Sequence, residues 1–93
     1  MPYISHSDRM TLNHTLTTLG ARIKCYEEYE GILNYCISTL INDLLKEPTT
    51  YAQINRLIGV LECAKLELYR RIAAPHEDKK IEENGDVYGA TSD

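Results

Sequence analysis

Residues 51–74 read YAQINRLIGVLECAKLELYRRIAA, and this stretch decides the fold of the chain. Its apolar residues recur at intervals of three and four, which predicts a continuous apolar stripe along one α-helix. The members of that stripe are Ile54, Leu57, Leu61, Ala64, Leu68 and Ile72. Thr50 and Gln53 have the spacing of a capping box, so the helix is expected to begin at Tyr51. Pro75 is expected to end or kink it, because proline cannot donate a backbone hydrogen bond.

The same helix carries apolar residues outside this stripe, at Ile58, Val60 and Leu66. Gly59 and Cys63 are small side chains four residues apart, a spacing that lets a second helix approach closely. A helix that is apolar on several sides is usually buried on several sides. In a chain of 93 residues we expect some of those neighbours to come from another subunit, so the protein is predicted to be oligomeric.

A polar stripe runs along one flank of the helix, at Asn55, Glu62, Lys65 and Tyr69. One interpretation is a solvated face that carries a Glu62–Lys65 ion pair. Solvated faces are the commoner case for charged helix residues. The other interpretation is a half-buried polar network that lines a ligand pocket or a subunit interface.

The N-terminal part predicts one further helix. Residues 1–10 are expected to be extended, and residues 11–24 show the apolar spacing of a helix. Thr11 or Asn13 has the side chain of an N-cap and is expected to begin this helix.

Residues 32–46 form the second predicted helix, which has a broad apolar face. Only residues 47–49 separate it from the central helix, and such short links join antiparallel neighbours. The fold class is therefore predicted as all-α. The predicted architecture is an antiparallel helical hairpin with an additional N-terminal helix and a short C-terminal helix or arm.

The C-terminal residues 76–93 form a charged arm within this single domain of residues 1–93. Pro75 can open a short helix there, and Gly85 can end it. Beyond that helix only Val87 and Tyr88 are apolar anchors. The arm is either a frayed terminus or a segment that pins itself onto a neighbouring subunit. Residues 90–93 are expected to be disordered.

Composition excludes several classes of protein. The net charge of −4 argues against direct DNA binding, which needs a clustered positive field. The chain shows neither a signal peptide nor an apolar run long enough for a membrane. Cys25, Cys36 and Cys63 are odd in number and widely spaced, which favours reduced thiols in a cytosolic protein.

One acidic spacing is typical of metal chemistry. Glu27 and Glu30 form an ExxE pair of the kind that all-helical nucleoside-triphosphate pyrophosphohydrolases use to hold Mg²⁺. Those enzymes complete the site with a later ExxD pair, whereas Glu62 is followed three residues on by Lys65. We therefore predict no catalytic residue, no metal and no cofactor, and the acidic turn is read as solvated.

A specific signature runs through the second half of the chain, in the segments IGVLE at 58–62, Lys65, Glu67, YRR at 69–71, Pro75, ED at 77–78 and ENGDVY at 83–88. On these residues the chain resembles a family of small proteins encoded widely in tailed bacteriophages. The resemblance covers most of the length and departs from the family pattern at Ile32 and His76. It implies phage origin and expression in the cytoplasm of a bacterial host, and it implies no activity. Because its signature includes residues 83–88, it favours a docked arm over a frayed terminus.

The resemblance to phage proteins, together with these residues, leads us to expect a non-catalytic binding protein that sequesters a nucleotide immune signal of the host, of the cyclic oligonucleotide type. Tyrosines would stack on bases, and cationic side chains would bind phosphate. The alternative is a helical protein-interaction module, an adaptor or inhibitor of a host or phage protein. The expected partners are a second copy of the chain, the nucleotide, and a host protein. The predicted ligand-binding residues are Tyr69, Arg70, Arg71, Lys65, Glu62, Asn55 and Tyr88.

Overall fold

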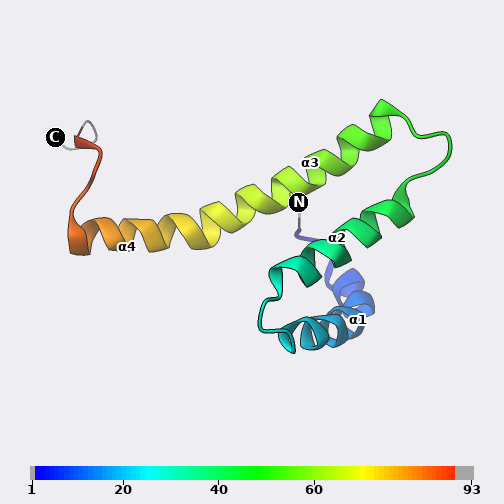
Figure 1. The fold of residues 1–93 in the computed structure, drawn as a ribbon, viewed down its shortest axis with the longest axis horizontal. Coiled ribbons are helices and arrows are strands. Elements are labelled where there is room, and N and C mark those ends of the chain that lie inside the picture. Colours follow the sequence, from blue (N-terminus) through cyan, green and yellow to red (C-terminus); the bar gives the residue numbers. More distant parts are fainter. Residues whose placement is uncertain (1, 90–93) are drawn as a thin grey trace. The chain divides into compact units, whose positions relative to one another are not determined.

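A computed structural model describes residues 2–89, and all regular secondary structure among them is helical (Figure 1). The predicted all-α class is confirmed, and within residues 2–89 there is no strand. The elements are α1 (His6–Lys24), α2 (Glu30–Leu44), α3 (Tyr51–Leu68), the π-helical turn η1 (Tyr69–Ala73) and α4 (Ala74–Asn84). The disorder predicted for residues 90–93 lies outside the described residues.

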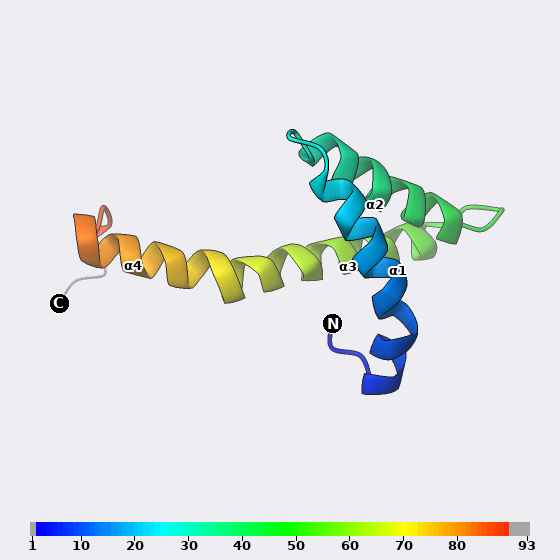
Figure 2. The ribbon, with the colours of Figure 1, turned by 90° about the horizontal axis from the view of Figure 1, so that it is seen from below.

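The chain divides into two units, Met1–Ile58 and Gly59–Asp93. The first unit contains α1, α2 and the first part of α3. The second contains the rest of α3, then η1 and α4. Within the second unit these three segments follow one another as one unbroken helical path (Figure 2). The boundary falls between Ile58 and Gly59, inside the stretch that the sequence predicts as a single helix.

Helix α1 begins five residues earlier than predicted. Ser5 is its N-cap, and the Ser5 Oγ accepts a hydrogen bond from the backbone N–H of Asp8 at 3.2 Å. Asp8 also places a negative charge in the first turn, where it complements the helix dipole. The prediction of an extended segment over residues 1–10 is therefore wrong from His6 onward. The predicted caps Thr11 and Asn13 lie inside the helix.

Thr11 tolerates this interior position because its hydroxyl donates to the carbonyl of Ser7 at 3.1 Å. Such back-bonding one turn along the helix satisfies a threonine hydroxyl without ending the helix. Thr11 is thus compatible with the interior of α1.

The connector between α2 and α3 is held by Gln53. Its Oε1 accepts from the N–H of Lys46 at 3.1 Å, and its Nε2 donates to the carbonyl of Pro48 at 3.3 Å. The Thr50 Oγ1 accepts from the N–H of Gln53 at 3.3 Å, so the threonine half of the predicted capping box is confirmed. The glutamine side chain reaches the connector instead of the backbone of Thr50. Helix α2 accordingly stops at Leu44, short of the predicted end at residue 46.

Replacing Thr50 with Ala is expected to lower the free energy of unfolding by about 1 kcal/mol, because it removes an N-cap acceptor from α3. Chemical denaturation followed by circular dichroism measures this loss. Thr49→Ala is the matched control, because Thr49 is a neighbouring exposed threonine with no hydrogen bond to α3 within residues 2–89. Equal losses in the two variants would show that the cap does not stabilise the helix.

The chain stays helical through Pro75 because η1 widens the helix just before it. The N–H of Ala74 donates to the carbonyl of Tyr69, five residues back. In a regular α-helix the ring of Pro75 would clash with the carbonyl of Arg71, four residues back. A π-helical turn accommodates such a residue. Pro75 then lies in the first turn of α4, where it was predicted to open a short helix.

Apolar side chains remain accessible on every helix. Among residues 2–89 no side chain is buried. In the first unit some apolar residues are half-buried, at Leu19, Ile23, Ile32, Cys36, Ile41, Leu45, Ile54 and Leu57. Another stripe of α2 is exposed at intervals of three and four, at Leu33, Ile37, Leu40 and Leu44. We call these four residues the α2 stripe.

Candidate functional site

Three of the predicted ligand-binding residues are consecutive on η1. Tyr69, Arg70 and Arg71 occupy the first three positions of this π-helical turn. Turns of this kind occur frequently at functional sites. Glu62 and Lys65 lie upstream on α3 in the same unit, and Tyr88 follows α4. Asn55 is exposed on the part of α3 that belongs to the first unit.

The cations of the second unit differ in how they are paired. Lys65 Nζ lies 3.0 Å from Glu62 Oε1, so the predicted Glu62–Lys65 pair is confirmed. Arg70 Nη2 lies 3.0 Å from the Oε1 of Glu67, whose side chain is 24% exposed. Both pairs join residues three apart on a helix surface, and exposed pairs of this kind contribute only about 0.3–0.5 kcal/mol. The Arg71 guanidinium makes no hydrogen bond or ion pair with any of residues 2–89.

Tyr69 is held against α4. Its hydroxyl donates a hydrogen bond to the Glu77 carboxylate. Eight residues of regular α-helix leave two side chains about 80° apart around the axis. The wider turn of η1 uses more residues per revolution and so brings Tyr69 and Glu77 closer to one face. The π-helical turn thus explains a contact that regular helix spacing does not predict.

The Glu77 carboxylate changes the acidity of this tyrosine. The hydrogen bond to Glu77 raises the pKa of Tyr69 above the usual 10.0, and the charge of Glu77, desolvation and the charge of Asp78 add to it in that order. Because the folded protein prefers the neutral phenol of Tyr69, the interaction of Tyr69 with Glu77 stabilises the fold at pH values below the ordinary pKa of tyrosine. It is lost as the pH rises through the raised value.

Glu77→Gln is expected to move the pKa of Tyr69 back toward its ordinary value, because the amide carries no charge. A pH titration followed by NMR of the Tyr69 ring measures this change. Asp78→Asn is the matched control and should give a smaller fall, since Asp78 acts only through its charge at longer range. An unchanged Tyr69 pKa in the Glu77 variant would contradict the contact.

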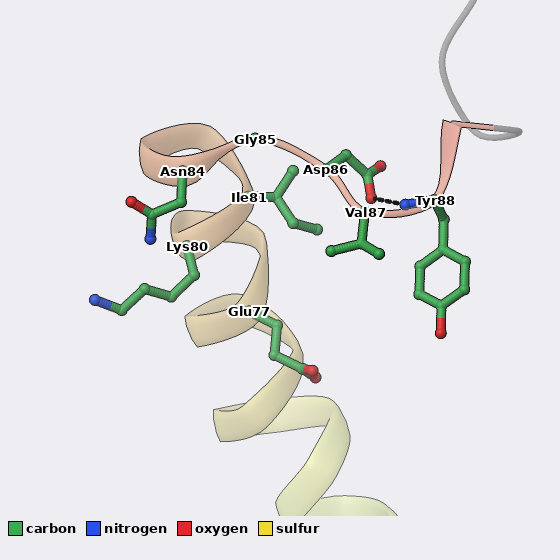
Figure 3. Close-up of a pocket in the computed structure, with 8 residues that line it drawn as sticks. All are labelled: Glu77, Lys80, Ile81, Asn84, Gly85, Asp86, Val87 and Tyr88. Atoms are coloured by element: carbon green, nitrogen blue, oxygen red, sulfur yellow. Dashed lines mark hydrogen bonds between the residues drawn. The ribbon is translucent and has the colours of Figure 1, made fainter.

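The end of α4 and the following residues form a shallow groove of about 310 Å³ (Figure 3). Gly85 ends α4 at a φ of 90°, a conformation that favours glycine. The Asp86 Oδ1 then accepts from the N–H of Tyr88 at 2.8 Å, which turns the chain back along the helix. Figure 3 shows the Ile81 side chain extending toward Val87. The groove is lined by Glu77, Lys80, Ile81, Asn84, Gly85, Asp86, Val87 and Tyr88.

Of the residues that line this groove, only Tyr88 was among the ligand-binding residues predicted from the sequence. Glu77 and Ile81 are four residues apart on α4, and that spacing together with the terminating Gly85 was the available signal.

Within residues 2–89 the side chains form neither a cluster of metal ligands nor a disulfide. No group of three or more His, Cys, Asp or Glu side chains within residues 2–89 could hold a metal ion. The cysteines are free thiols at Cys25, Cys36 and Cys63.

These observations define a small all-helical protein with exposed apolar faces and a polar turn. The profile of a protein family described as a domain of unknown function (DUF6899) matches residues 1–87, and the chain belongs to that family. No curated protein and no solved structure matches the chain. None of the helices within residues 2–89 has the length and apolar content that a membrane crossing requires.

Proposed function

We propose that the chain is a phage-encoded, non-catalytic binding protein that self-associates and captures a small nucleotide of the host. The nucleotide is of the cyclic oligonucleotide type, and the capture takes place in the host cytoplasm. One observation carries the proposal: apolar side chains lie on every helix, yet none within residues 2–89 is buried. Contiguous exposed apolar surface of this kind marks interaction sites.

The α2 stripe supports the self-association. Its four side chains, Leu33, Ile37, Leu40 and Leu44, are between 36% and 65% exposed. Fully burying one such side chain contributes about 1.5–3 kcal/mol. A second copy that covered the stripe would therefore supply several kcal/mol per chain. In the proposed assembly α2 and α3 act as the antiparallel hairpin, with their open faces turned to another copy.

The π-helical turn supports a phosphate-bearing ligand. The Arg71 guanidinium has no partner within residues 2–89, the Lys65–Glu62 pair is exposed on both sides, and in the Arg70–Glu67 pair the arginine is 67% exposed. Such weak pairs exchange readily for phosphate, which binds arginine through two charge-assisted hydrogen bonds. Tyr69 is 56% exposed and offers its ring for base stacking.

The signature of residues 58–88 supports the phage origin. It combines IGVLE, YRR and ENGDVY in one order and spacing, and the family match over residues 1–87 covers it as far as Val87. Expression in a bacterial cytoplasm follows from that origin.

A protein partner is the second candidate, and the groove beside α4 favours it. Glu77 and Asp86 line this groove together with the apolar Ile81 and Val87. Carboxylates repel a phosphate but suit the backbone and basic side chains of a protein. The chain would then be a helical adaptor or inhibitor of a host or phage protein.

Native mass spectrometry of the purified protein, alone and mixed with a panel of cyclic and linear nucleotides, tests the proposal. It reports the number of subunits and the bound mass in one spectrum. We expect an oligomer that gains one defined nucleotide mass per site and returns that nucleotide unaltered on denaturation.

Each of the other possible results of this measurement would contradict one part of the proposed function. A nucleotide returned in altered form would point to an enzyme. An oligomer without bound nucleotide would favour the protein-interaction module. A monomer at micromolar concentration would contradict self-association itself.

A further inference from the structure

We propose that a hollow at the connector between α2 and α3 binds a phosphate monoester, at a site separate from the turn η1. We call this concavity the connector hollow. It has a volume of about 360 Å³ and is lined by Leu44, Lys46, Gln53, Arg56 and Leu57. All of these residues belong to the first unit of the chain. The inference goes beyond the proposed function, because it requires neither self-association nor a ligand at η1.

Gln53 brings the two cations of the hollow together. The backbone N–H of Lys46 donates to the Gln53 Oε1 at 3.1 Å, which ties the start of the connector to the first turn of α3. Arg56 lies three residues beyond Gln53, on the same side of α3. A cation from the connector and a cation from the helix therefore line one hollow.

Both cations lack a partner of opposite charge. The Lys46 ammonium and the Arg56 guanidinium make no hydrogen bond or ion pair with any of residues 2–89. Asp43 and Glu47 are close to Lys46 in the sequence, yet within the described residues neither forms an ion pair with it. None of the residues that line the hollow is acidic. Two like charges beside one hollow repel each other, and a bound anion would remove that repulsion.

Gln53 also supplies a third hydrogen-bond donor. Its Nε2 donates one hydrogen to the carbonyl of Pro48 at 3.3 Å. A side-chain amide nitrogen carries two hydrogens, and the second has no acceptor within residues 2–89. Because the hydrogen bonds to Lys46 and Pro48 already hold this amide in place, little further ordering is needed when it donates to a ligand.

These donors favour a phosphate monoester among small anions. A phosphate monoester carries about two negative charges at neutral pH, which matches the two cations. The planar guanidinium of Arg56 suits phosphate, because it can form two parallel hydrogen bonds with it. A phosphodiester carries only one charge and matches the pair less well.

The apolar part of the lining indicates an ester instead of free phosphate. Leu44 and Leu57 line the hollow together with the cations, and Leu44 is 65% exposed. A volume of about 360 Å³ lies within the range of small-molecule sites. The hollow therefore has room and apolar contact for the group that is esterified to the phosphate.

Titration with phenyl phosphate, followed by ¹H–¹⁵N NMR of the full chain, tests the site. We expect saturable shifts at residues 44–57, including the side-chain signals of Gln53 and Arg56. Inorganic phosphate should shift the same signals with a weaker affinity. Sodium chloride at equal ionic strength controls for general screening. Shifts at residues 44–57 that do not saturate, or that chloride reproduces, would overturn the proposal. Equal affinities for the two phosphates would overturn the assignment to an ester.

Substitution of the two cations provides the second test. Lys46→Gln and Arg56→Gln should each weaken the binding of phenyl phosphate by about tenfold, because each removes one charge-assisted contact. Arg22→Gln is the matched control, since it removes an exposed arginine from α1, outside the hollow, and should bind as the unchanged protein does. Circular dichroism verifies that each variant keeps its helix content. Unchanged affinity in both hollow variants would contradict the site.

The results for the hollow and for the proposed nucleotide site can be read separately. Phenyl phosphate shifts confined to residues 69–71 would overturn the connector hollow and leave the proposed nucleotide site in place. Saturable shifts at residues 44–57, in a chain that binds no nucleotide in native mass spectrometry, would support the hollow and contradict the proposed nucleotide capture.

Discussion

A Leu40→Asp chain is expected to be monomeric at concentrations where the unchanged protein is an oligomer. Leu40 lies in the middle of the α2 stripe and is 55% exposed in the single chain. If another copy covers it, the substitution buries an unpaired carboxylate and removes an apolar contact. Stranding a buried charge costs about 3–5 kcal/mol. That corresponds to a fall in affinity of about two to four orders of magnitude, which sedimentation or native mass spectrometry resolves.

The neighbouring Thr39→Asp is the matched control for this change. It introduces the same charge into the same helix, at a polar residue beside the stripe. We expect the Thr39 variant to remain oligomeric and both variants to keep the helical circular dichroism signal. Oligomers of equal stability from both chains would rule out the α2 stripe as the contact between copies.

Arg71→Ala is expected to reduce nucleotide affinity by about a hundredfold while leaving the subunit number unchanged. Charge-assisted hydrogen bonds from arginine to phosphate are among the stronger polar contacts, each worth about 1.5–3 kcal/mol. Arg71 has no partner within residues 2–89 to compete with the ligand. Titration calorimetry with the nucleotide found by mass spectrometry measures the change.

Arg22→Ala serves as the control for Arg71→Ala. It removes the same side chain from an exposed position on α1, outside η1. Its nucleotide affinity should match that of the unchanged protein. If Arg71→Ala binds as tightly as the control, Arg71 does not belong to the binding site.

Apolar periodicity was sufficient to predict the helical class and the central helix. Its start at Tyr51 was predicted correctly because Thr50 is a strong local signal. The start of α1 was missed because Ser5 and Asp8 form a cap before the apolar pattern begins. Cap chemistry and apolar periodicity are independent signals, and here the cap decides where the helix begins.

Much less of the candidate site could be predicted. The Glu62–Lys65 pair follows from helix spacing alone and was predicted. The Tyr69–Glu77 contact was missed because it depends on the π-helical turn. The sequence signal for that turn was Pro75, and a proline in a helix is compatible with an end, a kink or a widened turn.

The π-helical turn η1 also determines how far the faces of α4 are rotated around the helix axis relative to the preceding turns of α3. A five-residue hydrogen-bond loop absorbs about one residue more than a regular α-helical turn does, so η1 acts as a built-in insertion between α3 and α4. Regular α-helical spacing over the same five residues, Tyr69–Ala73, would rotate the faces of α4 by about 100° relative to the preceding α3 turns. The groove residues of α4 would rotate with it. A change of this turn between π-helical and α-helical spacing is therefore a route by which a chain of this kind could re-aim its C-terminal surface without changing any side chain.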